Sequence, residues 1–245
     1  MVLWLCGDGT LVTDNDGGVI SWNDQSGNSN HAAQICKPSM RPLLVGNVLN
    51  GKPVVRFDGH KDFLTCKAIS ALNTDLITWF IVFKTNDQTK NQKLIQSAYQ
   101  WGARWWSDKM WGSYISDSKL AGYALSETGR LTAVKHPLDA QWHLQSVTWK
   151  DNDEVAALLD GENELAEGGA NAQPQNHQLL RVGAGSDQVI GPSPSPSFTA
   201  NTWSRPLRFR TRVCSFCVQS TYSFASALAN FRHAVPPRPV PGSRA

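Results

Sequence analysis

The chain has 245 residues, with 23 Lys or Arg and 20 Asp or Glu, so its formal net charge is +3. This length suits one large β-domain or two small ones. Hydrophobic residues make up 41%, enough for a packed core over most of the chain. The longest apolar run, at 76–83, is strand-sized and contains Thr78, so we expect no transmembrane helix. The N-terminal Met-Val-Leu-Trp-Leu-Cys lacks the basic start and the small-residue cleavage site of a signal peptide.

The charge is divided unevenly along the chain. Residues 1–187 hold 16 basic and 20 acidic side chains, whereas residues 188–245 hold seven Arg and no acidic residue. A mildly acidic body with a basic tail is not typical of a protein that binds nucleic acid. The five Cys are an odd number, so at least one thiol stays unpaired or pairs with another chain. We therefore infer no disulfide framework.

The pattern of apolar residues predicts β-strands almost throughout. Turn sequences built from Asp, Asn and Gly recur between short apolar and aromatic runs. Many short strands without a long 3.6-residue period predict a sandwich or a barrel. The predicted strands cover residues 2–5, 19–22, 54–57, 63–66, 76–85, 94–98, 111–115, 142–150, 155–160 and 179–183.

Three of these segments also predict how their strands are placed in the sheets. Residues 76–83 are apolar at odd and even positions alike, which predicts a central strand covered on both faces. In 142–149 the large side chains change parity between Leu144 and Val147, so either both faces are buried or a bulge re-aims the strand. Residues 155–160, followed by a Gly turn and a second short run, predict a hairpin.

Several motifs between residues 2 and 64 are specific in order and spacing. They are Leu-Trp-Leu at 3–5, Trp-Asn-Asp-Gln-Ser-Gly-Asn-Ser-Asn-His-Ala at 22–32, and Gly-Lys-Pro-Val-Val-Arg-Phe-Asp-Gly at 51–59. The series resembles the concanavalin A-like lectin/glucanase superfamily, and within it the bacterial laminin-G-like jelly-roll domains. By itself, the loop at 24–31 is predicted chiefly to bond its own backbone, with a ligand or metal role as the alternative.

The resemblance implies an all-β fold, an antiparallel two-sheet jelly-roll β-sandwich. It also implies an extracellular or cell-surface setting, often as one module of a longer protein, and a carbohydrate- or ligand-binding role. It does not by itself imply an enzyme. The expected partner is therefore a carbohydrate, and the alternative is an adhesive or structural module that binds another surface protein.

The C-terminal part departs from the pattern that the resemblance implies. Domains of this kind would continue after 179–183 with a closing strand and a short helix, but here Pro and Ser alternate and Arg-rich sequence follows. We predict a sandwich over 1–190 and a poorly ordered tail over 191–245. Two interpretations stay open. Either a frame-shifted or replaced tail leaves the sandwich without its C-terminal strand and with an exposed edge, or the tail is a genuine basic linker.

The sequence lacks the catalytic motifs of related glucanases. Those enzymes carry Glu-x-Asp-x-x-Glu on one strand, which places two carboxylates on one face. The five Glu of this chain form no such run, and no G-x-S-x-G, P-loop or H-E-x-x-H motif occurs. We predict a module that binds without catalysis, with a glycoside hydrolase as the disfavoured alternative.

Calcium is the metal that the sequence fits best. Asp14 and Asp16 concentrate oxygen ligands in one turn, and Asp151 and Asp153 do so in another, so the two turns are rival candidates. Neither turn completes an EF-hand, and acidic turns that are merely solvated are the alternative interpretation.

An aromatic segment gives the strongest indication of a ligand. Six Tyr and Trp residues lie between positions 99 and 114. A flat ring can stack on the C–H face of a pyranose while polar neighbours bond the hydroxyl groups. The alternative is that these rings fill the core of the sandwich. The predicted glycan site consists of Trp101, Arg104, Trp105, Trp106, Trp111 and Tyr114.

Overall fold

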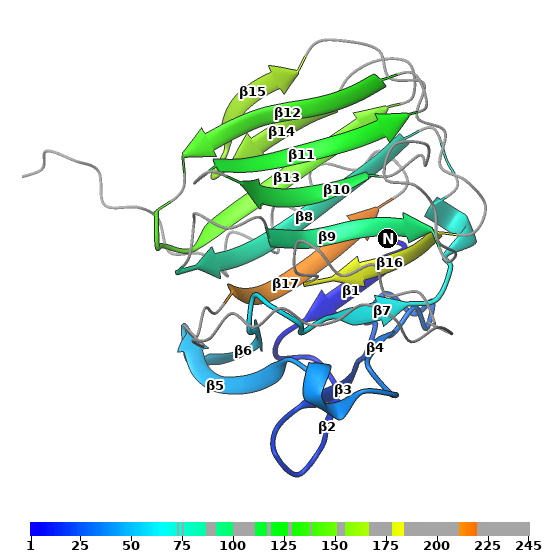
Figure 1. Ribbon diagram of the computed structural model, residues 1–245, viewed down its shortest axis with the longest axis vertical. Helices are drawn as coiled ribbons and strands as arrows, with labels where there is room; N and C mark the ends of the chain where they lie inside the picture. Colours follow the sequence, from blue (N-terminus) through cyan, green and yellow to red (C-terminus); the bar gives the residue numbers. More distant parts are fainter. Residues whose placement is uncertain are drawn as a thin grey trace, which may run out of the picture.

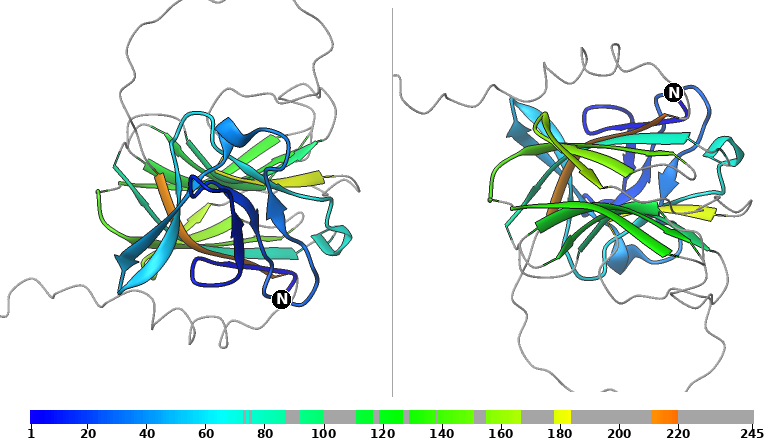
Figure 2. Two further views of the ribbon diagram at one scale, coloured as in Figure 1. Left: turned by 90° about the horizontal axis from the view of Figure 1, so that it is seen from below. Right: turned by 90° about the horizontal axis from the view of Figure 1, so that it is seen from above.

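Two antiparallel β-sheets pack face to face in the computed structural model (Figures 1 and 2). The predicted all-β antiparallel sandwich is therefore confirmed. The structure describes residues 1–72, 74, 76–86, 92–99, 111–116, 119–126, 129–137, 139–150, 155–166, 178–183 and 211–219.

One sheet has eight strands within these residues. Across the sheet they run β15 (Glu162–Ala166), β14 (Val155–Leu159), β13 (His143–Lys150), β8 (Leu76–Thr85), β17 (Thr211–Gln219), β6 (Lys52–Phe57) and β5 (Leu43–Leu49). The eighth strand, β1 (Leu3–Cys6), pairs with β17. The predicted hairpin is confirmed, because β14 and β15 pair antiparallel around the turn at Asp160.

The other sheet has nine strands within the described residues. Their order is β12 (Gly129–Pro137), β11 (Lys119–Ser126), β10 (Trp111–Ser116), β9 (Gln92–Tyr99), β16 (Gln178–Val182), β7 (Leu64–Cys66), β4 (Ala32–Ala33), β3 (Val19–Trp22) and β2 (Leu11–Thr13). In the described part of the chain, two short 3₁₀ helices, η1 (Pro38–Met40) and η2 (Ser70–Leu72), lie in connections.

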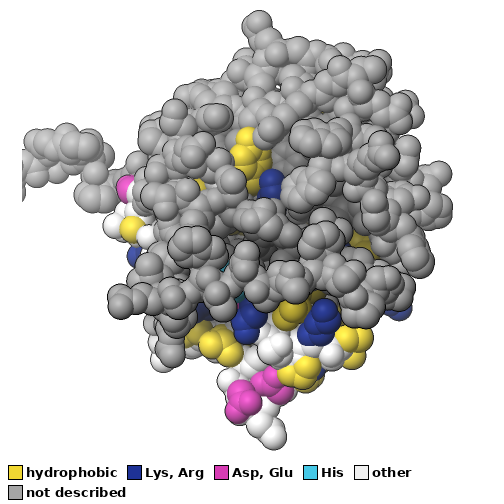
Figure 3. Space-filling model, in the orientation of Figure 1, with side chains coloured by type: hydrophobic (Ala, Val, Ile, Leu, Met, Phe, Trp, Pro, Cys, Tyr) yellow, Lys and Arg dark blue, Asp and Glu magenta, His cyan; other side chains and the backbone are white. Residues whose placement is uncertain are grey.

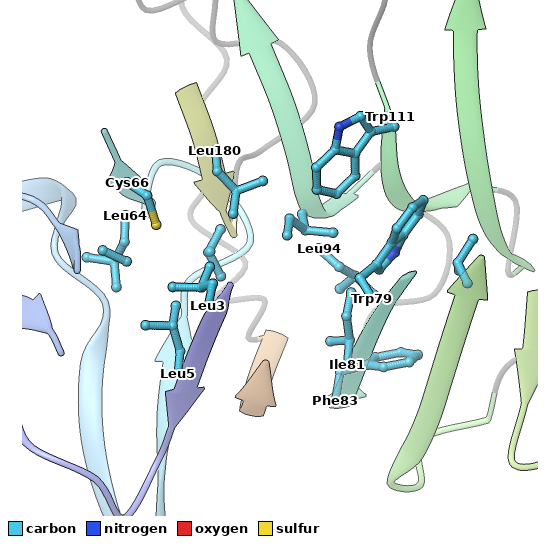
Figure 4. Packing of buried hydrophobic residues seen from close by; sticks show 14 of the residues in the cluster. Leu3, Leu5, Leu64, Cys66, Trp79, Ile81, Phe83, Leu94, Trp111 and Leu180 are labelled. Carbon is cyan, nitrogen blue, oxygen red and sulfur yellow. The ribbon is translucent and has the colours of Figure 1, made fainter. Parts of the chain in front are cut away.

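The main core lies between the sheets. Every second residue of β8, including Trp79, Ile81 and Phe83, is buried against the nine-stranded sheet. The Trp79 and Trp111 ring centroids lie 4.8 Å apart, which joins the two sheets through their largest side chains. Figure 4 shows these rings next to Leu94. Burial of each large apolar side chain stabilises the fold by about 1.5–3 kcal/mol.

The alternate residues of β8 are buried too, on the outer face of the eight-stranded sheet. Phe80 and Val82 form a second apolar cluster with Val54, and Leu144 packs against it. The pairing of β8 with β13 shows no register shift. The change of parity predicted in 142–149 therefore reflects two covered faces and not a bulge, and the prediction of a central strand at 76–83 is confirmed.

The C-terminal part of the chain contributes a strand. β17 pairs with β8 along one edge and with β6 and β1 along the other, with a bulge between Val213 and Ser215. The sequence left open a sandwich without its closing strand, whereas β17 lies in the middle of a sheet. Residues 184–210 and 220–245 lie outside the described part, so the boundary near 190 stays a prediction.

Gly183, which follows β16, and Thr211, which begins β17, both lie beside Phe57. A Cβ at Gly183, which follows β16, would lie 2.1 Å from Cδ1 of Phe57, so the two residues are in close contact. Phe57 is also in register with Thr211, the first residue of β17. The chain therefore leaves one sheet and enters the other at the same point of the sandwich.

Candidate functional site

The predicted aromatic cluster falls on β10 and on the connection before it. Trp101, Arg104, Trp105 and Trp106 belong to the connection between β9 and β10 and lie outside the described residues, so their role stays a prediction. Trp111 and Tyr114 lie on β10 itself. The alternation of a strand places these two side chains on opposite faces of the sheet.

Trp111 belongs to the main core. Its side chain is 3% exposed and packs against Trp79. Its backbone is fixed by Ser97, whose Oγ accepts the Trp111 N–H at 2.9 Å and donates to the Trp111 carbonyl at 3.2 Å. This indole therefore holds the two sheets together and is not placed to stack on an external ligand.

Tyr114 faces away from the core. It is in register with Lys93 on β9, where the pairing shifts by one residue. Lys93 Nζ lies 4.5 Å from the centre of the Tyr114 ring, a cation–π contact, and Tyr114 is 8% exposed. Figure 3 looks onto this face of the molecule, where hydrophobic side chains (yellow) and basic side chains (dark blue) are visible. Because the ring is almost completely buried and Lys93 lies over it, the described structure does not present Tyr114 to a sugar.

One row of residues in register crosses all nine strands of this sheet. Facing residues of neighbouring antiparallel strands share one face. Their sequence neighbours, such as Trp22, Leu180 and Ile95, are buried in the core, so the row lies on the outer face. From β2 to β12 the row is Val12, Ser21, Ala33, Thr65, Arg181, Gln96, Gly112, Tyr123 and Thr132.

The row has polar residues at its centre and small ones beside them. Arg181 stands on the middle strand, between Thr65 and Gln96, and all three are half-buried. Ala33 and Gly112 come next on either side. Ala33 and Gly112 therefore have the shortest side chains among the described residues of the row.

The environment of Arg181 is partly apolar. Its guanidinium carbon lies 5.9 Å from the centre of the Phe63 ring, near the limit of a cation–π contact. Burial lowers the pKa of Arg181 from its ordinary value, because removing water disfavours the charged form. A guanidinium in such a place still carries its charge at neutral pH, since its ordinary pKa lies far above the neutral range.

The loop at 24–31 bonds its own backbone, as the structural interpretation of its sequence predicts. The Asp24 carboxylate accepts the N–H groups of Trp4 at 2.8 Å, Ser26 at 2.9 Å and Asn30 at 3.0 Å. Burial alone would raise the pKa of Asp24, but these hydrogen bonds outweigh it and lower the pKa. Ser26 and Asn30 also donate to the carbonyl of Val2, so the loop fastens the start of β1.

The predicted calcium ligands are partly engaged elsewhere. Asp14 accepts the N–H groups of Asp16 at 3.1 Å and Gly18 at 2.7 Å, and its second oxygen lies 2.9 Å from Arg41. Arg41 is the main reason that the pKa of Asp14 is lowered. The Arg41 guanidinium therefore competes with a divalent cation for this carboxylate, and calcium at Asp14 and Asp16 stays a prediction.

The second calcium turn is not described. Asp151 and Asp153 lie outside the described residues, so calcium there stays a prediction. Among the residues that the structure does describe, no group of three or more His, Cys, Asp or Glu side chains is placed to hold a metal ion. The same residues contain no helix that is long and apolar enough to cross a membrane.

Sequence reasoning missed the row centred on Arg181. The row joins strands that are distant in the sequence, and no local pattern reveals which residues come into register. One signal was available, because Arg181 is the single charged residue in the predicted strand at 179–183. A charged side chain in an apolar strand marks the face that does not enter the core.

The comparisons with known proteins support the fold. No family model and no curated protein matches the chain. Among solved structures, the binding domain of Paraclostridial Mosquitocidal Protein 1 is 10% identical with a TM-score of 0.61, covering 94% of this chain and 51% of that one. The binding domain of botulinum neurotoxin serotype D is 8% identical with a TM-score of 0.59, covering 95% and 50%. The chain thus spans about half the length of these structures, which share its β-sandwich.

Proposed function

We propose that this chain is a non-catalytic binding module that holds a carbohydrate on the outer face of the nine-stranded sheet. The observation that carries the proposal is the row of residues in register, with Thr65, Arg181 and Gln96 at its centre. A few polar groups amid small and aromatic neighbours are what a sugar site requires, because they bond hydroxyl groups while the rest makes close contact.

The similar solved structures point in the same direction. One is the binding domain of botulinum neurotoxin DC in complex with SialylT, and another is described through the dependence of botulinum neurotoxin type C cell entry on two ganglioside molecules. The fold does not dictate the ligand, so these descriptions support binding in general. From the sequence motifs at 22–32 and 51–59 we further propose a relationship to laminin-G-like domains, and a setting at the cell surface or outside the cell.

In the proposed complex the sugar chain lies across the strands. Gln96 and Thr65 bond hydroxyl groups, and the sugar passes over Ala33 and Gly112, where side chains are shortest. The connection that contains Trp101, Trp105 and Trp106 joins β9 to β10, two strands of this sheet, and in the proposal its rings add stacking contacts. Stacking on Tyr or Trp provides a large contact area at a low entropy cost.

Affinity electrophoresis through gels that contain single polysaccharides tests the proposal, after a glycan array has selected them. We expect retardation of the unaltered protein and a several-fold weaker effect for Gln96→Ala. Thr148→Ala is the matched control, because Thr148 lies on the eight-stranded sheet, where its hydroxyl is 3.0 Å from that of Thr78 on the neighbouring strand. The proposal fails if no glycan retards the protein, or if Gln96→Ala binds as well as the unaltered protein does.

The alternative is an adhesive module that binds a protein, and one observation favours it. Three apolar side chains near β3 are exposed, namely Val12 at 47%, Ile35 at 70% and Leu43 at 44%. Exposed apolar residues that gather on a surface often mark protein contacts. An adhesive module would bind no polysaccharide, and its association with a partner would weaken with Ile35→Ser and not with Gln96→Ala.

A further inference from the structure

An apolar cluster lies on the outer face of the eight-stranded sheet. Its buried members are Leu49, Val54, Phe80 and Val82. The partly buried residues packed against them are Trp4, Val45, Val48, Trp142 and Leu144. Each of these residues belongs to a strand of this sheet or, in the case of Trp142, directly precedes one. Within the described residues, the cluster therefore has no apolar member from another layer.

The burial of Val82 indicates that something covers this face. In register beside Val82 lie Leu144 on β13 and Ser215 on β17. Neighbours in one sheet flank a side chain, whereas the space above it is filled by another layer or by water. A valine that water reached from above would keep some exposed surface, but Val82 is 0% exposed. A covering layer accounts for this burial, and it also removes apolar surface that would otherwise favour association.

The C-terminal segment starts beside the cluster. β17 ends at Gln219, two residues beyond Cys217. Cys217 is in register with Trp4 on one side and with Phe80 on the other, and both belong to the cluster. Two residues of a strand span about 7 Å, so residues 220–245 begin at about that distance from the row of Trp4 and Phe80. A short turn after β17 is enough to bring the chain over the cluster.

The sequence of residues 221–231 has the pattern of an amphipathic helix. The segment contains no charged residue, no Gly and no Pro, whereas Pro and Arg recur after residue 235. Phe224, Leu228 and Phe231 are spaced i, i+4 and i+7, which places them on one side of a helix, with Ser226 on the opposite side. A helix of this length is marginal in water by itself, so it needs an apolar partner against which to form.

We propose that residues 221–231 form a helix that packs over this cluster, with Phe224, Leu228 and Phe231 against Val82 and Leu144. Such a helix is about 16 Å long, and neighbouring strands lie about 4.8 Å apart, so it is long enough to cross four strands. β1, β17, β8 and β13 are the four strands that follow one another at this place.

The proposed contact extends the binding module to about residue 231, and the Pro- and Arg-rich end follows it. The contact lies on the sheet opposite the proposed carbohydrate face, so it does not depend on the proposed function. The segment and the cluster are both uncharged, so they match in chemistry. A charged segment would lose its hydration on such a face without gaining an ionic partner from the cluster.

Hydrogen exchange of the unaltered 245-residue chain tests the proposal first. Amides of residues 225–231 should exchange at least tenfold more slowly than those of residues 238–245, because a docked helix protects its hydrogen-bonded N–H groups. Equal rates in the two segments would overturn the proposal.

Matched substitutions then test which side of the helix makes the contact. Leu228→Asp should lower the urea concentration at the midpoint of unfolding by about 1 M and raise the binding of a dye that fluoresces on apolar surfaces several-fold. Ser226→Asp, on the opposite side, should change neither. If Leu228→Asp does not fold, Leu228→Ala and Ser226→Ala provide the same comparison. Equal effects at the two positions would overturn the proposal.

A double-mutant cycle tests whether the segment touches the sheet. One variant replaces Phe224, Leu228 and Phe231 together by Ala, and the other is Leu144→Ala. The combined loss of stability should be smaller than the sum of the separate losses, since both variants remove the same contact. Strict additivity would overturn the proposal. So would sedimentation as a dimer that Leu144→Asp dissociates and Leu228→Asp does not, because a second copy would then cover this face.

Discussion

His143 Nδ1 lies 2.9 Å from Oδ2 of Asp160, and the imidazole that carries it is almost completely buried. The other ring nitrogen, Nε2, lies 3.1 Å from Oδ1 of Asp139, so both nitrogens face carboxylates. Asp160 also accepts the N–H of Leu144 at 2.9 Å, which fastens the β14–β15 turn to β13. Two carboxylates can both accept from the ring only when it is protonated, so this arrangement favours the imidazolium.

We predict that His143 makes the stability of the fold depend on pH. Burial lowers the pKa of His143, but Asp160 and Asp139 outweigh burial, so the pKa is raised above 6.5. The folded state then holds the proton more tightly than the unfolded state. The stabilisation is complete below about pH 6.5 and is lost as the pH rises through the folded pKa.

His143→Gln provides the comparison for this effect. The difference in unfolding free energy between the unaltered protein and the variant should shrink as the pH increases from 6 to 9. An NMR titration of the imidazole measures its pKa directly. A pKa below 6.5 would contradict the prediction.

The Asp62 side chain should favour its uncharged form in the folded state, whereas His143 favours its charged form. Burial is the main cause that raises the pKa of Asp62 to about 7, and the nearby carboxylate of Asp58 adds to it. The folded state therefore binds a proton between about pH 4 and pH 7 that the unfolded state has released. Stability must fall as the pH rises through this window. Asp62→Asn cannot ionise, so its stability relative to the unaltered protein should increase from pH 4 to pH 8 in denaturant titrations.

Asn at position 62 keeps the hydrogen bond that fixes the turn. The Asp62 carboxylate accepts the Asp58 N–H at 2.9 Å, and an amide oxygen can accept it equally. Asp58→Asn is a less suitable change, because Asp58 Oδ1 accepts the N–H groups of His60, Lys61 and Asp62. If the stability difference between Asp62→Asn and the unaltered protein is independent of pH, Asp62 does not titrate in this window.

The strands that sequence reasoning identified are those whose pattern is local. The apolar residues of 76–83 predicted a central strand correctly, because a strand that is buried on both faces carries apolar residues at odd and even positions alike. The loop at 24–31 was likewise predictable, since its polar side chains bond the backbone within a few residues. In contrast, β11 and β12 contain Ala, Gly, Ser and Thr, which give weak alternation, and the sequence did not reveal them.

Long-range pairing accounts for the rest of what was missed. The Arg-rich surroundings of 211–219 indicated a disordered tail, yet this segment reads Thr-Arg-Val-Cys-Ser-Phe-Cys-Val-Gln and pairs with three strands. Strand preference depends on the neighbours available, and those neighbours lie more than 120 residues earlier in the sequence. The same reason hides the row around Arg181, which exists only once nine strands are in register.

The indole of Trp79 should contribute to stability through a hydrogen bond as well as through packing. Its Nε1 donates to Ser113 Oγ at 2.8 Å across the buried space between the sheets. Trp79→Phe removes the donor and part of the ring, and we expect a loss of about 2–4 kcal/mol. Ser113→Ala should cost about 1–2 kcal/mol, because it leaves the buried N–H without an acceptor.

A double-mutant cycle isolates that hydrogen bond. In the double variant both partners are absent, so the loss should be smaller than the sum of the two single losses by about 1 kcal/mol. Urea denaturation of the four proteins provides the free energies. Strict additivity would mean that the bond contributes nothing and that Trp79 acts through packing alone.

Gly183 should tolerate a side chain much less well than Gly17 does. Both have positive φ, +75° and +80°, but a Cβ at Gly183 would meet Phe57 at 2.1 Å whereas Gly17 has nothing within 4 Å. Gly17→Ala should cost about 1–2 kcal/mol from the backbone alone. Gly183→Ala should cost about 1–3 kcal/mol more, because Phe57 must move within a packed core. Equal losses in thermal unfolding would show that Phe57 adjusts freely.

Two truncated chains test whether the sandwich needs β17. Without residues 211–219, β8 and β6 lose the strand that lies between them and β1 loses its partner in the sheet. A chain ending at residue 190 would then expose two unpaired edges next to apolar residues, a combination that favours aggregation. We expect this chain to show no cooperative unfolding transition by circular dichroism. A chain ending at residue 220 keeps β17 and should unfold cooperatively. If the shorter chain unfolds cooperatively at the same temperature, the sheet closes without β17 and the basic tail is a linker.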